Sequence, residues 1–241
     1  MIFLVNAENR VQFAADLMDM HSQRKIVFVD RAGWTVPVLG DSEVDRYDRE
    51  ETMYLLAKAQ PDGQVLASAR LLPTTGPHLM SDLFAGACRE SSPRGPTVWE
   101  VSRFCTTPDL QGRGMRLGLL WEVICGVMEA GLLYGIDEVI FAANRALLPL
   151  ALQCGWDART LGTPLRDNED EVTAVAARIT TTGLAAVRRN HGVPAPVTRL
   201  LANAPPSGPP LFACKLPMET AQGMSYPGGS IGHFCYDWPS S

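Results

Sequence analysis

A glycine-rich turn lies near the middle of the 241-residue chain, between a predicted strand and a predicted helix. The turn reads Gln111-Gly112-Arg113-Gly114, and the helix after it extends for about twenty residues to Tyr134. A strand that leads through such a turn into a helix exposes backbone N–H groups at the helix N-terminus, where they can bind a phosphate group. A glycine-rich connection that binds nothing would have the same sequence. The turn is therefore a candidate phosphate site.

Charged residues form a second candidate site, although they are spread along the sequence. The residues concerned are Arg24, Asp45, Asp48, Arg70, Glu100 and Arg103. Glu100 and Arg103 lie between apolar neighbours in the segment TVWEVSRFCT, where burying an unpaired charge would be costly. The set contains both signs, so the acids and the arginines could balance one another in a structural network of ion pairs. A site that binds a charged substrate is the alternative.

The elements that must position these residues alternate between helices and strands. The expected order is a helix over 7–22, a surface loop over 30–48, a hairpin of 52–59 and 64–72, a strand over 97–106, the glycine turn and its helix, a strand over 137–143, a helix over 145–154 and a return to the sheet at 155–156. This order predicts an α/β fold, a mixed twisted β-sheet flanked by helices on both faces.

The length of the chain is sufficient for one full-sized domain with an extension. We expect a single catalytic domain over residues 1–200. Residues 201–241 are rich in Pro and Gly and are expected to form a C-terminal extension, in which 211–216 could add one strand to the sheet.

Composition excludes several classes of protein. The net charge is −5 and no long basic run is present, so nucleic-acid binding is not expected. The N-terminus lacks the features of a signal peptide, and no uninterrupted apolar stretch is long enough to predict a membrane span. The six cysteines form no Cys-x-x-Cys pair, which is typical of reduced thiols rather than a metal site. We therefore expect a cytoplasmic protein that binds no metal.

The charged residues and two aromatic residues together match a known pattern. The matching positions are Arg-x-x-x-Phe (Arg24 and Phe28), Trp34, Asp45-x-x-Asp48, Arg70 and Trp-Glu-Val-Ser-Arg-Phe (residues 99–104). In order and spacing they resemble the eight hallmark positions of the acyl-homoserine lactone synthases. The turn at Gln111 is similar to the pyrophosphate-binding turn of the Gcn5-related N-acetyltransferases, Gln/Arg-x-x-Gly-x-Gly/Ala, although Arg116 occupies its final small position.

The resemblance implies a fold similar to that of the Gcn5-related N-acetyltransferases. It also implies an enzyme that transfers an acyl group from a thioester donor to the amine of S-adenosylmethionine (SAM). Lactonisation then releases methylthioadenosine and yields a quorum-sensing signal. SAM is a co-substrate in this family, no cofactor is tightly bound, and the donor is a phosphopantetheine thioester. Acyl carrier protein is therefore the expected partner, with acyl-CoA as the other possible donor.

The resemblance further assigns roles to residues. Glu100 is the expected general base for the amine, and Arg103 and Arg70 are the other expected catalytic residues, with Arg70 locking the acids in place. Residues expected to bind SAM or the donor are Arg24, Phe28, Trp34, Asp45, Asp48, Gln111, Gly112, Arg113 and Gly114. The aromatic pair would enclose the adenosine and the sulfonium, the aspartates would bind or orient the cationic groups, and the turn would hold the phosphopantetheine arm.

Two further expectations concern geometry. Arg103 lies three residues after Glu100, so it would project to the opposite face of the strand unless a bulge intervenes. The acyl pocket is expected to be lined by Phe141, Ala142 and Ala143. Their small side chains would leave room for a longer acyl chain, and the absence of a hydroxyl disfavours a 3-oxo acyl group.

An acidic carrier protein would require a basic docking surface. The candidate residues are Arg113, Arg116, Arg145 and Arg159, only one of which lies in the expected helix over 145–154. These few arginines make a weak docking surface, so acyl-CoA remains an alternative donor. Ordinary solvated charges would also explain these arginines.

Other functions are possible for such a chain. An N-acyltransferase that acylates another amine would keep the turn at Gln111 but would have no need of Asp45, Asp48 and Trp34. A degenerate member of the family could bind acyl carrier protein without turnover, but the residues whose loss would indicate this are present. A receptor for the lactone is disfavoured because no C-terminal helix-turn-helix is recognisable.

Overall fold

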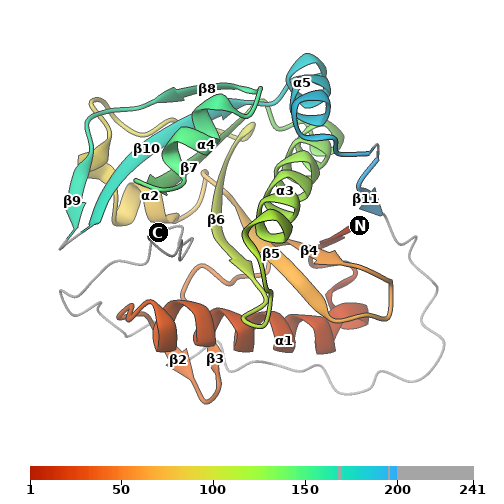
Figure 1. Cartoon of the computed structure of the whole chain (residues 1–241). Helices are drawn as coiled ribbons and strands as arrows, with labels where there is room; N and C mark the ends of the chain where they lie inside the picture. The colour runs from red at the N-terminus through yellow and green to blue at the C-terminus, as the bar shows by residue number, and fades with distance from the viewer. Residues whose placement is uncertain (168–169, 195, 200–241) are drawn as a thin grey trace.

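The computed structural model describes residues 1–167, 170–194 and 196–199, which form a mixed β-sheet with helices on both faces (Figure 1). The main sheet has the strand order β11-β1-β4-β5-β6-β7-β10-β8, and β9 also pairs with β10. Its strands are β1 (Ile2–Val5), β4 (Met53–Lys58), β5 (Val65–Pro73), β6 (Val98–Thr106), β7 (Glu138–Asn144), β8 (Asp157–Thr160), β9 (Leu165–Asp167), β10 (Asp170–Arg178) and β11 (Thr198–Arg199). Only β1–β11 and β6–β7 pair in parallel within this part of the chain. The predicted fold class is confirmed.

One face of the sheet is covered by α1 (Ala14–Arg24), which continues without a break into a π-helix over Lys25–Arg31. Strand alternation decides which side chains meet this helix. Phe3 and Val5 of β1 pack with Met20 of α1, while the neighbouring β1 residues face the other way. The expected helix over 7–22 is therefore present, preceded by a 3-10 turn at Arg10–Phe13.

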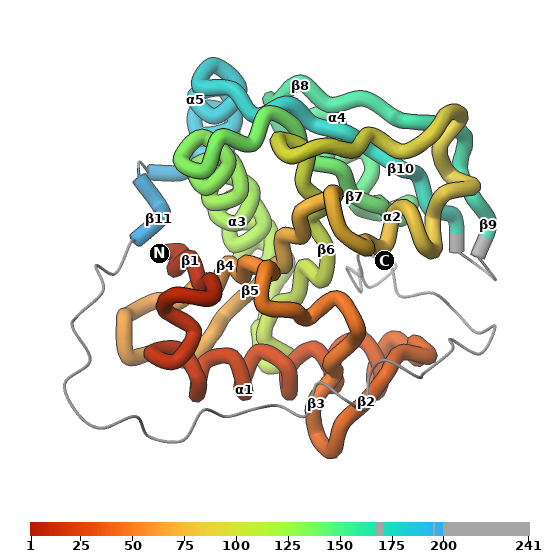
Figure 2. The backbone as a smooth tube through the Cα atoms, turned by 180° about the vertical axis from the view of Figure 1, so that it is seen from behind, coloured from red at the N-terminus to blue at the C-terminus, as the bar shows by residue number. Residues whose placement is uncertain are grey.

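The opposite face is covered by α3 (Arg113–Tyr134), against which α5 (Thr181–His191) packs (Figure 2). By length and composition α3 could cross a membrane, but 56% of its most apolar window is buried inside the fold. Its glycines permit close approach: a Cβ on Gly131 would lie 2.9 Å from Cγ2 of Ile179. The apolar character of α3 is thus explained by its place in the core.

Strands β6 and β7 separate part-way along their length, as Figure 1 shows. Their parallel register joins Val98 to Glu138, Trp99 to Val139 and Glu100 to Ile140. Beyond Glu100, β6 continues to Thr106 beside β5, and β7 continues to Asn144 beside β10. The opening between them faces the N-terminus of α3, because the turn at Gly112 follows directly after β6.

Residues 30–48 form only in part the surface loop that the sequence predicted. The segment contains the end of the π-helix and a small hairpin of β2 (Val38–Leu39) and β3 (Ser42–Glu43), and Asp45 and Tyr47 are buried. Charge and glycine favoured a loop, but burial here is made possible by ion pairs that a single segment does not reveal.

Other elements were predicted with small errors or were not predicted. The expected helix over 145–154 is α4 (Leu148–Gln153). Strand β10, helix α5 and the short helix α2 (Leu79–Asp82) were not predicted from the sequence. The expected strand over 211–216 lies outside the described residues. Four cysteines are described, all free and all buried except the half-buried Cys88, as expected for reduced thiols.

Candidate active site

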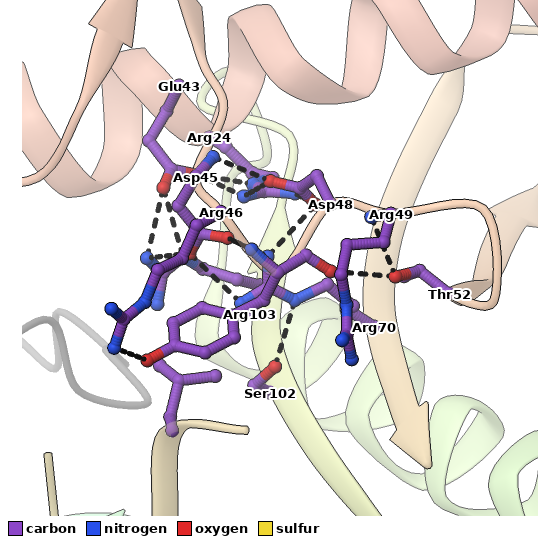
Figure 3. A network of polar contacts seen from close by, with 12 residues as sticks. Arg24, Glu43, Asp45, Arg46, Asp48, Arg49, Thr52, Arg70, Ser102 and Arg103 are labelled. Carbon is purple, nitrogen blue, oxygen red and sulfur yellow. Dashed lines mark hydrogen bonds and ion pairs between the residues drawn. The ribbon is translucent and has the colours of Figure 1, made fainter. Parts of the chain in front are cut away.

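Six buried charged side chains form one network on the α1 face of the sheet (Figure 3). They are Arg24, Glu43, Asp45, Asp48, Arg70 and Arg103. The three positive and three negative charges balance. Arg24 and Arg70 have no exposed surface, so this balance is necessary: an unpaired charge in their place would be strongly destabilising.

Asp45 and Asp48 have their carboxylate oxygens filled by protein donors. Asp45 accepts hydrogen bonds from Arg70 at 2.6 and 3.1 Å, from Arg103 at 2.8 Å and from the Tyr47 N–H at 2.8 Å. Asp48 accepts two from Arg24, at 2.9 and 3.0 Å, and others from the Tyr54 hydroxyl and the Asp45 N–H.

A carboxylate offers about four acceptor sites, and both of these carboxyl groups use theirs within the protein. The aspartates were expected to bind or orient the cationic groups of SAM; in this structure their oxygens hold the arginines. Burial alone would raise both pKa values, but the facing arginines outweigh it and hold the pKa of Asp45 below, and that of Asp48 well below, the usual value. Arg70 makes the contacts expected of a locking residue.

Glu43 is the member of the network that the sequence did not single out. It is fully buried and accepts from Arg103 at 3.0 and 3.2 Å and from Nε of Arg24 at 2.5 Å. It lies in the loop predicted to be exposed, so an acidic residue there carried no signal. The one clue was the charge balance of the candidate residues. Without Glu100 they comprise three arginines and two aspartates, so one negative charge is missing.

Arg103 reaches the network because β6 is irregular at this point. Its φ is 53°, a left-handed conformation that is rare for a residue with a side chain. The register between β5 and β6 shifts between Ser68 and Arg70. The alternation of side chains is thereby broken, and Arg103 joins Glu100 and Ser102 on the same face. The bulge on which the sequence prediction depended is present.

Phe28 and Trp34 stack face to face beside the network. Their ring centroids lie 4.4 Å apart at an interplanar angle of 3°, and the Arg103 guanidinium carbon lies 5.8 and 5.9 Å from the two rings. Cys105 packs against them. Rings at this separation leave no room for a third ring between them, so the pair does not enclose adenosine in the expected way. It offers a single aromatic wall.

Glu100 lies on the same face as the network but outside its ion pairs. Its carboxylate accepts one backbone hydrogen bond at each oxygen, from Leu79 at 3.2 Å and from Met80 at 2.5 Å. Burial raises the pKa of Glu100 to about 7, although the two amides and the nearby Arg70 favour its charged form. A carboxyl group with this pKa can exchange a proton near neutral pH.

The glycine turn lies at the exposed start of α3. Gly112 has a φ of 86°, which a residue with a side chain would adopt only with strain. Arg31 reaches the same place and donates to the Pro108 carbonyl at 2.8 Å, while Arg116 donates to the Leu110 carbonyl at 3.1 Å. Helix N–H groups and basic side chains are thus brought together, as the sequence predicted.

A small apolar cavity of about 30 Å³ lies on the other face of the sheet, between the separating strands and α3. Its walls are formed by Val101, Phe104, Leu120, Val123, Ile124, Val127, Phe141, Leu147, Ala151 and Trp156. Phe141 lines it, and Ala143 shares that face of β7. Ala142 packs on the opposite face, so the three residues expected to line the acyl pocket do not all face this cavity.

Comparison with known proteins is consistent with this arrangement. The family described as autoinducer synthase matches residues 8–185. The chain belongs to the autoinducer synthase family. Among curated relatives, acyl-homoserine-lactone synthases of Ralstonia nicotianae and Rhizobium etli are 40% and 32% identical, over 67% and 64% of this chain and 80% and 71% of theirs. The expected resemblance is confirmed, and this autoinducer synthase is an acyltransferase.

Solved structures of other autoinducer synthases share the fold. A CoA-dependent acyl-homoserine lactone synthase, BjaI, with SAM and isopentyl-CoA has a TM-score of 0.76 and 28% identity, over 85% of this chain and 94% of that one. A second CoA-dependent synthase, MesI, has a TM-score of 0.74 and 26% identity, over 82% and 98%. TofI in complex with an inhibitor and MTA has a TM-score of 0.65.

The structure brings most of the predicted residues together. Five of the eight hallmark residues join the network, the two aromatic ones lie beside it, and Glu100 lies on the same face. Among the described residues, no group of three or more His, Cys, Asp or Glu side chains could hold a metal ion.

Proposed function

We propose that this autoinducer synthase acylates the α-amine of SAM from a thioester donor and then closes the homoserine lactone, with Glu100 as the base. The observation that carries the proposal is the environment of Glu100: a buried carboxyl group with a pKa near 7, at the last residue before β6 separates from β7.

The first step forms an amide bond. Glu100 accepts a proton from the ammonium group of SAM, directly or through one water, so that the neutral amine can attack the thioester carbonyl. The carbon–sulfur bond of the donor then breaks and the thiol leaves. Beyond Glu100 β6 no longer pairs with β7, and backbone N–H groups of β6 on that side would stabilise the oxyanion.

The second step closes the ring. A carboxylate oxygen of the acylated SAM attacks the γ-carbon of its own methionine chain, the carbon–sulfonium bond breaks, and methylthioadenosine leaves. The attack is intramolecular and the leaving group is neutral, so correct positioning supplies most of the acceleration. In this proposal the ion-pair network and the Phe28–Trp34 wall fix the shape of the SAM site, because the oxygens of Asp45 and Asp48 have no free acceptor position.

The donor site is proposed at the opening between β6 and β7. The α3 N-terminus, with Gly112, Arg113, Gly114 and the side chain of Gln111, would bind the phosphates, and the apolar cavity would take the acyl chain. Arg31 and Arg116 add positive charge. We propose acyl-CoA as the donor, because two solved synthases with this fold are described as CoA-dependent and one of them was solved with isopentyl-CoA. Acyl carrier protein is the alternative.

Cavity size bears on the acyl group. The cavity has a volume of only about 30 Å³ in this structure, so its walls would have to move apart to admit an acyl chain. Ala142, one of the small residues expected to leave room for a longer chain, packs on the other face of β7. We propose a short acyl group without a 3-oxo substituent, since all ten lining residues are apolar.

Mass spectrometry of the products would test the function. The pure protein is incubated with SAM and with separate panels of CoA and acyl carrier protein thioesters. We expect a short, unsubstituted acyl-homoserine lactone and methylthioadenosine from the CoA panel. Product from the carrier-protein panel alone would overturn the donor proposal. A dominant 3-oxo or long-chain product would overturn the proposed acyl group. No product from either panel would overturn the proposed function.

A further inference from the structure

The short helix α2 supplies both backbone hydrogen bonds to Glu100. The N–H groups of Leu79 and Met80 each reach one oxygen of that carboxylate. Both residues are buried, in an apolar cluster with Leu72 of β5 and Ile140 of β7. The position of α2 therefore decides how well the charged form of Glu100 is solvated by the protein.

A side chain at the end of α2 ties this helix to the segment before β4. Oδ2 of Asp82 accepts hydrogen bonds from Arg46 at 2.8 Å and from the hydroxyl of Tyr47 at 3.1 Å. Its other oxygen accepts from Ser81 at 2.8 Å. The Tyr47 hydroxyl also accepts from Arg46 at 2.8 Å. Arg46, Tyr47 and Asp82 thus contact one another where α2 ends.

Tyr47 in turn belongs to the border of the ion-pair network. Its N–H donates to Asp45, and the Arg70 guanidinium carbon lies 5.7 Å from the centre of its ring. The tyrosine has no exposed surface. A continuous set of contacts therefore runs from the network through Tyr47 and Asp82 to α2, and from α2 to Glu100.

We propose that Tyr47 and Asp82 are positioning residues that hold the α2 amides against the Glu100 carboxylate and so couple the general base to the ion-pair network. The proposal rests on the proposed role of Glu100 as the base. Neither residue touches the reacting atoms, and each acts through α2.

The direction of the effect follows from the groups that surround Glu100. Arg70 of β5 and the two amides favour its charged form, while burial and Asp45 oppose it. From the other elements packed here, α2 carries His78 and Asp82 close to its ends, Tyr47 precedes β4, and β7 contributes the apolar Ile140. If α2 shifts, the hydrogen bonds from its two backbone amides to Glu100 are lost first, and the pKa of Glu100 rises. Activity at low pH must then fall more than activity at high pH.

Tyr47→Phe tests this with little change in volume. The variant keeps the buried ring and removes the hydroxyl that bonds Asp82. We expect the acid limb of the kcat/KM profile for SAM to move to higher pH by roughly 0.5–1 unit, the size expected from weakening one hydrogen bond to a charged group. At alkaline pH the kcat/KM values of the variant and the wild type should converge. Asp82→Ala should move the limb in the same direction.

The matched control is Tyr134→Phe, which removes an exposed tyrosine hydroxyl that accepts from Asn6 far from the site. It should leave the profile unchanged. The amine of SAM titrates equally in every variant, so a difference between profiles belongs to the enzyme. A uniform loss of activity at all pH values in Tyr47→Phe, or an unmoved acid limb, overturns the proposal. Absence of lactone from the wild type would instead overturn the proposed function.

Discussion

Glu100 combines deep burial with a position outside the ion-pair network, and this combination is the reason we propose it as the base. The six network charges neutralise one another, and the facing arginines hold the pKa values of Asp45 and Asp48 below their usual value. Glu100 is held by two neutral amides instead, and burial raises its pKa to about 7. In the proposed mechanism the paired charges build the site, and the carboxyl group outside the ion pairs takes the proton.

Replacement of Glu100 by Gln should separate binding from turnover. The amide side chain keeps the size of the residue but cannot accept the proton, so we expect kcat to fall by about 10²–10⁴-fold. Binding of SAM, measured by calorimetry, should change little, because the network and the Phe28–Trp34 wall are untouched. Wild-type turnover in Glu100→Gln would remove this residue from the mechanism.

Glu43 should be as important for stability as the hallmark residues around it. Glu43→Gln leaves Arg24 and Arg103 with one buried negative charge fewer, so we expect a loss of about 3–5 kcal/mol in the free energy of unfolding. Urea denaturation measures it. The control is Glu138→Gln, whose partner Arg159 is half exposed and which should cost less than about 1 kcal/mol. Equal losses in the two variants would contradict a special role for Glu43.

The sequence was a good guide to which residues gather, and a poorer guide to what they contact. The spacing from Arg24 to Arg103 predicted the cluster because those positions match a family pattern. Saturation of Asp45 and Asp48 by arginines was not predictable, since it depends on a bulge at Arg103 and on a loop that folds inward. Glu43 was missed for the same reason.

At the scale of elements, contacts between distant segments decided what local patterns could not. The hairpin of β4 and β5 was predicted well because its turn, Gln60-Pro61-Asp62-Gly63, is adjacent to both strands. Strand β10 is rich in alanine, a weak strand former, and it pairs with β7, which lies about 35 residues earlier. Such a strand is defined by its partner more than by its own residues.

The packing of α3 on the sheet can be tested by two glycines of the same helix. A Cβ at Gly131 would lie 2.9 Å from Ile179, whereas a Cβ at Gly118 would meet nothing within 4 Å. We expect Gly131→Ala to destabilise the protein by about 1–3 kcal/mol through overpacking. Gly118→Ala should stabilise it by about 0.5–1 kcal/mol through helix propensity. Chemical denaturation measures the free energy of unfolding of both variants. A change of the same sign in the two would contradict this view of the interface.

At the scale of the whole molecule, the buried acids act on stability in opposite directions as pH changes. The pKa values of Asp45 and Asp48 are lowered by folding, so their contribution is present above their ordinary value of 3.8 and is lost as pH falls below it. The pKa of Glu100 is raised from 4.5 to about 7, so folding favours its protonated form, and its contribution is lost as pH rises through this range.

A comparison of wild type with Glu100→Gln should reveal the second effect. Glutamine does not titrate, so the variant should gain stability relative to wild type between pH 5 and pH 8. The expected gain is on the order of 3 kcal/mol. Denaturation curves at several pH values provide the measurement. A constant difference between the two proteins would mean that Glu100 does not titrate in this range.

The boundary of the catalytic domain is the remaining whole-molecule prediction. The match to MesI covers 98% of that chain with 82% of this one, so a complete synthase fold needs no counterpart to the rest. The network, Glu100, the glycine turn and the cavity all lie within residues 1–160. A chain that stops after residue 200 should therefore keep its melting temperature within a few degrees and its kcat/KM within about threefold. It retains β11, whose Thr198 and neighbouring Val197 are held by Glu129 of α3. A truncated protein that folds but loses turnover would instead place part of the site in residues 201–241.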